Sequence, residues 1–263
     1  MESPFKAGLF AGEVAIVTGG GTGIGLGTAL ELGSLGARVV IAGRRAEVLE
    51  EAAGRIRETG AECLAVVCDI REVEQVEALV GESLSRFGRV DLLVNNAGGQ
   101  FPTTAESLKP KGWDAVIRNN LSGTWYVTQA VATRAMIPVR RGRIVNVIAN
   151  IARGFPGMVH TGAARAGVEN MTRTLAVEWA QFGIRAVAIA PGVIKSSGTD
   201  KYPPELIEAG RRRTPLKRIG TVDEVAHAIC FLGSSAADFV TGITFYIDGG
   251  ASLWGDNWMI PDL

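Results

Sequence analysis

Short apolar runs alternate along the whole chain with segments in which apolar residues recur every three or four positions. The first pattern is typical of strands and the second of amphipathic helices. The predicted strands are Val14–Val17, Arg38–Ala42, Cys63–Val67, Leu92–Val94, Ile144–Ile148, Arg185–Ile189 and Thr244–Ile247. The predicted helices are Ile24–Leu35, Ala46–Glu58, Val73–Phe87, Trp113–Ala135, Ala163–Phe182 and Val222–Leu232. Because strands this uniformly apolar are buried on both faces, we predict an α/β fold with a doubly wound parallel sheet between two layers of helices.

One stretch, Ile194–Gly220, departs from this alternation. It contains KSSGTDKYPPE and GRRRTPLKR and shows no clear apolar period. Irregular segments of this length in compact domains are commonly functional, so we interpret 194–220 as a lid over a site and name it the lid segment. No change of composition marks a second domain within the 263 residues, and we expect a single domain over residues 1–263.

The turn after the first predicted strand is rich in glycine. The run VAIVTGGGTGIG (14–25) joins a strand to a helix, and a second strand follows. In this context the glycines let the backbone turn sharply and approach a pyrophosphate, which the N–H groups and dipole of the helix start would bind. The predicted contacts come from Gly19, Thr22, Gly23, Ile24 and Gly25. The alternative is a tight turn that binds nothing.

The residues after the second predicted strand indicate which dinucleotide binds there. Such sites recognise the adenosine ribose at this point, with an acid for NAD and an arginine for NADP. This chain has Arg44 and Arg45, and no acid occurs before Glu47. Two guanidinium groups suit a 2′-phosphate, so we predict the cofactor NADP(H); the alternative is a pair of solvated charges. Asp69 and Ile70, after the third strand, are expected beside the adenine.

Composition excludes several classes of partner. Lysine and arginine number 27, as do aspartate and glutamate, so a net charge of +0 disfavours nucleic acid and anionic membrane surfaces. No apolar run is long enough to span a bilayer, and the first residues, MESPFKAGLFAGE, resemble no secretory leader, so we expect a cytoplasmic protein. The three cysteines form no CxxC pair and there are two histidines, so we expect neither a disulfide nor a metal site.

Several further motifs occur together in one order. They are Thr18-Gly19 with Gly23-Ile24-Gly25, then Asn95-Asn96-Ala97-Gly98, Asn120 and Pro191-Gly192. Together they resemble the short-chain dehydrogenase/reductase family over nearly the whole chain. The resemblance implies one Rossmann-type domain that assembles as a homotetramer. It also implies cofactor contacts from Asn96, Ala97 and Gly98, and a nicotinamide end held by Pro191, Gly192 and Ile194.

The same resemblance fails at the residues that usually carry catalysis. The family has a serine after the fifth strand, then a tyrosine and a lysine four positions apart on the next helix. Here the serine position reads Ala149, and the other two read Thr161 and Arg165. The usual acid for carbonyl reduction, a tyrosine whose pKa is lowered by lysine, is therefore missing.

Longer runs narrow the resemblance to a subfamily. NNAGGQFP (95–102), KGWDAV (111–116) and GFPGMVHTGAARAGV (154–168) resemble peroxisomal-type trans-2-enoyl-CoA reductases and, more distantly, 2,4-dienoyl-CoA reductases. They are also similar to bacterial enzymes assigned to citronellol or citronellal oxidation. We therefore expect an NADPH-dependent reductase of an activated alkene such as a trans-2-enoyl-CoA. The alternatives are an alcohol or aldehyde dehydrogenase with a terpenoid-like substrate, and an NADP-binding protein without activity.

Enoyl reduction leaves an enolate, which needs oxyanion donors rather than an acid on a carbonyl oxygen. Arg165 would bind the nicotinamide ribose and hold positive charge, but a guanidinium is no acid at neutral pH. Asn120 could order water or donate to the oxyanion, or could merely bend its helix. Thr161 offers a hydroxyl, and His160 is either a proton source or structural. Tyr202, in the lid segment, is either a donor or an exposed tyrosine.

The lid segment also carries five basic residues. Arg211, Arg212, Arg213, Lys217 and Arg218 suit the phosphates of coenzyme A. The alternative is a solvated basic turn offset by Glu205 and Glu208.

Residues 252–263, with Trp254 and Trp258, are too apolar for a free tail, so we expect them to pack beside the lid segment or on a neighbouring subunit.

Overall fold

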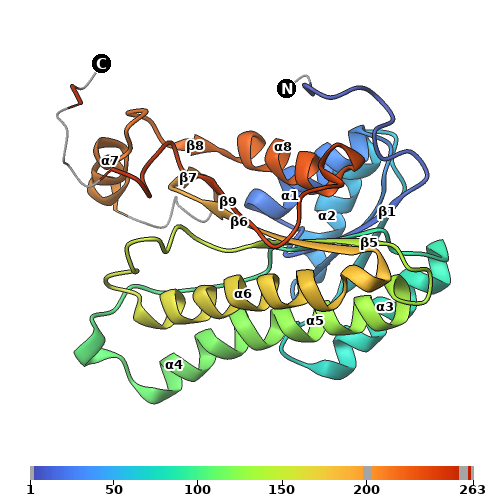
Figure 1. Cartoon of the computed structure of the whole chain (residues 1–263), viewed down its shortest axis with the longest axis horizontal. Coiled ribbons are helices and arrows are strands. Elements are labelled where there is room, and N and C mark those ends of the chain that lie inside the picture. The colour runs from blue at the N-terminus through green and yellow to red at the C-terminus, as the bar shows by residue number, and fades with distance from the viewer. Residues whose placement is uncertain (1–2, 198–202, 255–259, 262–263) are drawn as a thin grey trace.

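A parallel sheet forms the centre of the molecule in the computed structural model, which describes residues 3–197, 203–254 and 260–261 (Figure 1). Within these residues the main sheet has seven strands in the order β3-β2-β1-β4-β5-β6-β9, all parallel. The strands are β1 (Val14–Thr18), β2 (Arg38–Gly43), β3 (Cys63–Val67), β4 (Leu92–Asn95), β5 (Gly142–Val147), β6 (Ile184–Pro191) and β9 (Thr244–Ile247). The predicted α/β class and parallel sheet are thus confirmed.

Helices cover both faces of this sheet. Figure 1 shows α1, α2 and α8 on one face and α3, α4, α5 and α6 on the other. The helices are α1 (Gly23–Ser34), α2 (Ala46–Arg57), α3 (Val73–Phe87), α4 (Pro110–Ile117), α5 (Gly123–Val131), α6 (Val159–Glu178), α7 (Pro204–Arg213) and α8 (Val222–Gly233). Alternate residues of each strand enter different cores: Val17 packs on the α1 side and Ile16 on the α3 side. Continuous apolar strands therefore fill two cores at once, as their composition predicted.

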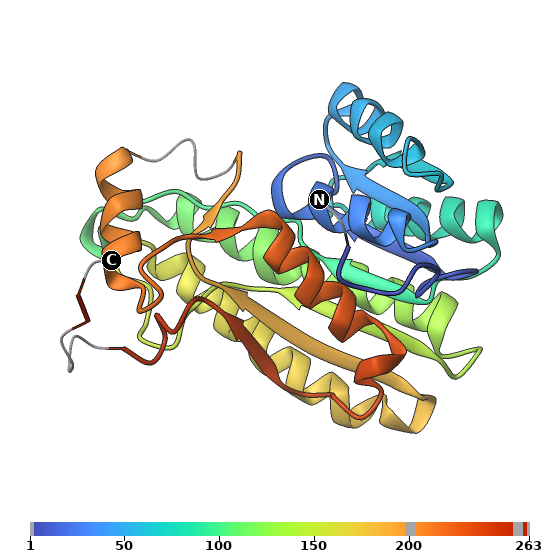
Figure 2. The same ribbon diagram turned by 90° about the horizontal axis from the view of Figure 1, so that it is seen from above.

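The strand order reverses between β1 and β4, which lie side by side at the centre of the sheet. In open α/β sheets this reversal opens a crevice at the carboxyl ends of the strands, where ligands bind. The glycine turn, the segment after β4 and the lid segment all leave the sheet at that edge. Seen from above, α7 stands beyond this edge and apart from the two helical layers (Figure 2).

The lid segment is more regular than the sequence indicated, so our prediction of an irregular loop was wrong. It contains α7 and a short parallel pair, β7 (Ile194–Lys195) with β8 (Gly220–Thr221). Pro204 in the first turn, Glu205 beside it and three arginines in the last turn all favour a helix. Its polar composition left no apolar period, and that period was the feature on which the prediction depended.

Two other helices differ from their predicted bounds. α6 begins at Val159, four residues earlier than expected, so His160 and Thr161 lie in its first turn. The predicted helix Trp113–Ala135 runs from Pro110 to Met136, with wide π turns at Arg118–Ser122 and Ala132–Met136. Shorter turns of 3₁₀ helix occur at Ala105–Ser107, Ala180–Phe182 and Ser235–Ala237. Among the described residues, no helix is both long and apolar enough to cross a bilayer.

Candidate active site

The glycine turn after β1 is built for close approach of another backbone. Gly19 has φ +66°, and a Cβ there would lie 2.9 Å from the Asn96 Nδ2 and 3.0 Å from the Ala97 Cα. Asn96 donates from Nδ2 to the Thr18 carbonyl at 2.9 Å, and both Asn96 N and Ala97 N donate to the Thr18 Oγ1 at 3.0 Å. The ends of β1 and β4 are thereby locked together around the crevice.

The start of α1 is available to an anion. Thr22 is extended at the N-cap position, and its side chain makes no cap hydrogen bond. The first N–H groups of a helix have no partners within the helix, and the dipole adds positive potential there. Gly23, with φ +55°, gives the helix start a conformation that a larger residue would strain. This arrangement suits a pyrophosphate, as the sequence predicted.

A cavity of about 150 Å³ continues from this turn towards the ends of β2 and β3. Its lining includes most of the predicted adenosine contacts, together with residues that the sequence did not single out, among them Asn119 at the π turn. The lining residues are Gly19, Gly21, Thr22, Ala42, Gly43, Arg44, Arg45, Val48, Leu49, Cys68, Asp69, Ile70, Ala97, Gly98 and Asn119. Arg44 and Arg45 are exposed at its rim. The shape, the uncapped helix and the basic rim fit the adenosine half of a dinucleotide.

Asp69 is engaged more firmly than the sequence indicated. Both of its carboxylate oxygens accept from the Arg71 guanidinium, at 2.5 Å and 2.9 Å for the shortest bonds. The hydrogen bonds from Arg71 hold the pKa of the Asp69 carboxyl below its usual range, and the charge of Arg44 adds to this. Asp69 therefore stays ionised at the cavity wall, with Arg71 as a fixed partner.

Arg165 lies at the centre of the predicted catalytic region. Its side chain is 8% exposed, and Nη1 donates to the Val147 carbonyl at 3.1 Å. Burial lowers the pKa of this guanidinium to about 10, so it remains protonated at neutral pH. A Cβ on Gly98 would collide with the Arg165 guanidinium and with the Asn120 side chain. Because Gly98 has no side chain, the segment after β4 can approach both Arg165 and Asn120 closely.

Asn120 clamps the loop that follows β4. It is 1% exposed and lies in the π turn, where widened helical geometry frees its side chain. Its Nδ2 donates to the Gly99 carbonyl at 2.7 Å, and its Oδ1 accepts from the Gly99 N–H at 3.2 Å. Nδ2 also donates to the Val116 carbonyl at 3.0 Å. Asn120 therefore fixes the backbone beside Gly98.

His160 and Thr161 are both fully buried in the first turn of α6. The His160 Nδ1 accepts from the Thr161 N–H at 2.8 Å, and the Thr161 Oγ1 lies 3.3 Å from the same nitrogen. The His160 Nε2 has no hydrogen-bond partner among the described residues. Phe101 meets the imidazole edge-on, with ring centroids 4.7 Å apart and planes at 80°. The structure thus brings His160, Thr161 and Arg165 together on one helix.

A residue that the sequence did not single out, Asp248, joins Asn150, the residue after the serine position, to residues 250–252. The Asn150 Nδ2 donates to the Asp248 Oδ2 at 2.8 Å. Asp248 also accepts from Gly250 N at 2.9 Å and Ser252 N at 2.6 Å. The Gly192 N–H donates to the Ile247 carbonyl at 3.0 Å, which fixes the predicted nicotinamide turn beside the same strand. Asp-Gly-Gly after a strand was the sequence feature that could have indicated this contact.

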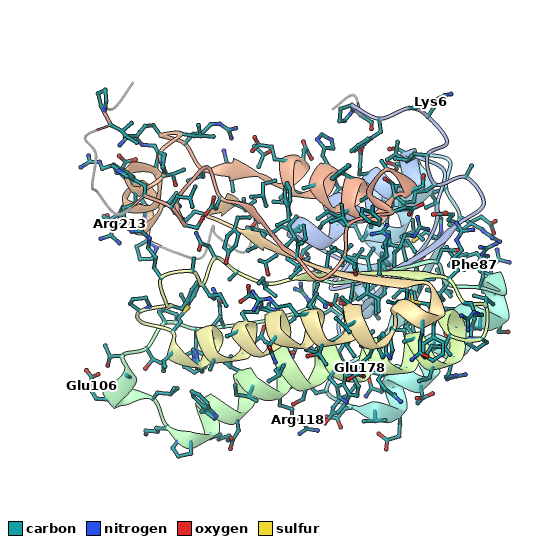
Figure 3. All side chains as sticks on the ribbon, in the orientation of Figure 1. Lys6, Phe87, Glu106, Arg118, Glu178 and Arg213 are labelled. Atoms are coloured by element: carbon teal, nitrogen blue, oxygen red, sulfur yellow. The ribbon has the colours of Figure 1, made fainter. Side chains whose placement is uncertain are left out.

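The basic residues of the lid segment are partly neutralised. Arg211 and Arg212 both donate to the Glu208 carboxylate at 2.9 Å, and these bonds lower the pKa of that carboxyl to about 2. Arg218 pairs in the same way with Glu224 of α8. Arg213 of α7 and Glu106, before α4, lie at the same end of the molecule, far from Phe87 (Figure 3). The predicted donor Tyr202 lies outside the described residues.

The first part of the tail packs beside the lid segment. The Lys217 Nζ lies 4.7 Å from the centroid of the Trp254 ring, within the range of a cation–π contact. Trp258 lies outside the described residues. The three cysteines are free thiols, and no cluster of potential metal ligands occurs in the part of the chain that is described.

Comparison with known proteins places these features in a family. The family model described as Enoyl-(Acyl carrier protein) reductase matches residues 19–252. The peroxisomal 2,4-dienoyl-CoA reductase of Danio rerio is 39% identical over 260 residues, covering 96% of this chain and 86% of its own. The 3-oxoacyl-[acyl-carrier-protein] reductase FabG of Thermotoga maritima is 38% identical, covering 91% and 97%. The solved citronellol catabolism dehydrogenase AtuB of Pseudomonas aeruginosa has a TM-score of 0.87 and 48% identity, covering 96% and 100%.

Proposed function

Because the chain belongs to the short-chain dehydrogenase/reductase family, we propose that it is an NADPH-dependent reductase that transfers hydride to an activated alkene, with a trans-2-enoyl-CoA thioester as the substrate. One observation carries the proposal. Thr161 and the cationic Arg165 are both buried, and by the resemblance of the sequence they stand where the family has its acid and its lysine. These residues suit a reaction that needs positive charge beside a developing oxyanion and no acid on a ketone oxygen.

The chemistry of an enoyl thioester matches these residues. Bound NADPH would supply hydride to the β-carbon, and the electron pair of the double bond would move onto the thioester oxygen. The guanidinium of Arg165 would stabilise the resulting enolate, because a fixed charge in a dry site is worth far more than in water. The α-carbon would then take a proton from water. Asn120 would keep the Gly98–Gly99 backbone in place while charge develops.

The cofactor would be held by the elements already described. The glycine turn and the start of α1 would bind the pyrophosphate, and Arg44 with Arg45 would bind the 2′-phosphate. Arg165 would contact the nicotinamide ribose, and Pro191, Gly192 and Ile194 would hold the nicotinamide end. Family resemblance further supports a homotetramer, which light scattering of the purified protein tests.

Coenzyme A phosphates would meet the basic side of the lid segment. Glu208 forms ion pairs with Arg211 and Arg212 and so neutralises part of their positive charge. Acyl-CoA binding would therefore recruit Arg213 and redistribute these exposed pairs, which salt screens. This contribution is expected to be modest, since exposed ion pairs exchange at little net gain.

A second candidate function rests on the 48% identity to AtuB, whose name places it in citronellol catabolism. On that hypothesis the chain oxidises an alcohol or aldehyde on a hydrophobic, terpenoid-like substrate. Its chemistry requires a base for the alcohol proton, and neither Thr161 nor Arg165 is suited to that role. The enoyl reductase hypothesis is therefore preferred.

A substrate panel separates the two. The purified protein is mixed with NADPH and crotonyl-CoA, a 2,4-dienoyl-CoA or a 3-oxoacyl-CoA, and in parallel with NADP⁺ and citronellol, while NADPH absorbance is recorded. We expect consumption with the conjugated thioesters at the highest kcat/KM. Faster reduction of the 3-oxoacyl-CoA, or turnover of citronellol alone, would refute the proposal. Tight NADPH binding without turnover on the whole panel would indicate a binding protein.

A further inference from the structure

The first part of the loop between β4 and α4 is fixed at two points, Gly99 and Thr103. Asn120 holds Gly99 through two hydrogen bonds. The Thr103 N–H donates to the Gly157 carbonyl at 2.8 Å, which ties the loop to the residues just before α6. Residues 99–103 therefore span from the π turn to the start of α6, directly beyond the point where Gly98 meets Arg165.

Phe101 lies in the middle of this span and is held from two sides. On one side it meets the His160 ring edge-on, with centroids 4.7 Å apart. On the other side it approaches α4, where a Cβ on Gly112 would lie only 3.0 Å from the Phe101 Cζ. The absence of a side chain at Gly112 thus admits the ring. Phe101 nevertheless remains 40% exposed, so part of a fixed aromatic ring is open to a ligand.

His160 itself has no surface to offer a substrate, because it is 0% exposed. Its Nδ1 accepts the Thr161 N–H at 2.8 Å, which sets the orientation of the ring. Its described aromatic neighbour is Phe101. Of the two described residues that contact the His160 ring, Thr161 is buried and Phe101 is partly exposed, so Phe101 is the one that can present a surface to a ligand.

We propose that Phe101 is the flat wall against which the conjugated acyl group of the substrate lies, and that His160 is the positioning residue that fixes this wall. The identity of the thioester rests on the proposed function. A 2-enoyl or 2,4-dienoyl group conjugated to a thioester is planar, so it presents a π face to the ring, whereas a saturated chain does not. Contacts between π systems contribute binding free energy beyond that of burying the same apolar surface area. The site would thus select for conjugation before any reaction occurs.

Binding to the NADP⁺ complex tests the wall without turnover, since NADP⁺ carries no hydride to transfer. Calorimetry compares 2,4-hexadienoyl-CoA with hexanoyl-CoA for the wild type and for Phe101→Leu, which keeps apolar bulk without a flat ring. We expect the wild type to prefer the dienoyl thioester by about three- to tenfold. Phe101→Leu should lose that preference and Phe101→Tyr should keep it. Phe239→Ala, at a fully exposed phenylalanine before β9, is the control and should keep it too.

Two His160 variants separate positioning from proton transfer. His160→Phe keeps an aromatic edge without a titratable proton, and Thr161 N retains the Met158 carbonyl as an acceptor. His160→Gln keeps a polar donor without the ring. We expect His160→Phe to preserve the dienoyl preference, kcat and the pH profile, and His160→Gln to lose the preference and raise KM. Loss of kcat in His160→Phe with an intact preference would make His160 a proton source and overturn its positioning role.

The remaining outcomes distinguish the wall from the proposed function. Equal wild-type affinities for the two thioesters, or a preserved preference in Phe101→Leu, would refute the wall. A wild-type preference without NADPH-dependent reduction would leave the wall standing and refute the enoyl reductase function. Binding of neither thioester would refute both. Thermal unfolding of each variant checks that the fold is retained.

Discussion

Replacing Arg165 with methionine removes a buried positive charge from the centre of the site while keeping most of the side-chain length. The guanidinium is 8% exposed and donates to the Val147 carbonyl, and it reaches Gly98 on the cofactor loop. If it stabilises the enolate, its loss should resemble the loss of one oxyanion donor, which costs about 2.7–4 kcal/mol or roughly 100- to 1,000-fold in kcat. Only the lost Val147 bond, worth about 1 kcal/mol, should appear in stability.

Replacing Arg165 with lysine adds a pH dependence whose sign follows from burial. Burial lowers the pKa of the arginine to about 10. The same burial would lower the pKa of a lysine, whose usual value already lies below that of arginine, further towards neutrality. The cation is present below the pKa and is lost above it. Activity of Arg165→Lys should therefore fall at a lower pH than that of the wild type, which should keep its activity up to about pH 10.

The assay is steady-state NADPH consumption with crotonyl-CoA at saturating cofactor, with the NADPH Kd measured separately by fluorescence. Separate measurement is needed because Arg165 is also expected to contact the nicotinamide ribose. Arg173→Met is the matched control, since Arg173 lies on the same helix, pairs with Glu169 and is exposed. A kcat of Arg165→Met within about threefold of the wild type would refute the role of the charge.

Three further predictions concern the cofactor, the lid segment and α8. Arg44→Ala should weaken NADPH by about tenfold or more and NADH hardly at all, because a charge-assisted bond to phosphate is lost; equal wild-type affinities for the two cofactors, measured by fluorescence titration, would contradict this. Replacing Arg211, Arg212 and Arg213 together with glutamine should raise KM for acyl-CoA at low salt and leave a truncated pantetheine thioester unaffected; equal losses on both would assign the arginines to folding. Thr221→Ala removes the capping box of α8 and should lower the free energy of unfolding in urea by about 1 kcal/mol, and an unchanged midpoint would show that the cap contributes nothing.

The central sheet and most of its helices could be predicted from the sequence because each carries a clear apolar period. α3 matched its predicted bounds, and Gly88 at its end adopts the left-handed conformation that stops a helix. α7 was missed because its residues are polar. The start of α6 was misplaced because its N-cap, Met158, has no side-chain cap to mark the position in the sequence. The apolar pattern therefore predicted the strands and helices that pack in the core. It did not predict the solvent-facing helix α7 or the start of α6, because neither has an apolar period or a capping side chain to mark it.

The candidate site divides in the same way. The residues proposed to bind the cofactor could be found from short stretches of sequence, because a glycine turn and the residues after each strand lie at one edge of a parallel sheet. The substrate half depends on contacts between distant residues. Asn150 and Asp248 lie 98 positions apart, and Asn120 and Gly99 lie 21 positions apart. Such pairs leave no periodic pattern, and the packing of Phe101 on His160 likewise became visible only in the fold.

Thr161 and Arg165 make physical sense as a pair. A lysine near a tyrosine lowers the pKa of the phenol. Where the resemblance aligns a threonine with that tyrosine, a lysine would have no phenol to act on. In a buried position a lysine would also risk losing its charge, whereas a guanidinium keeps it. Thr161 is 0% exposed, so neighbouring atoms already fill the space around it and a tyrosine ring would have to displace them. On the proposed function, Thr161 and Arg165 would thus serve to hold a charge rather than to give a proton, which is what reduction of a conjugated thioester would require.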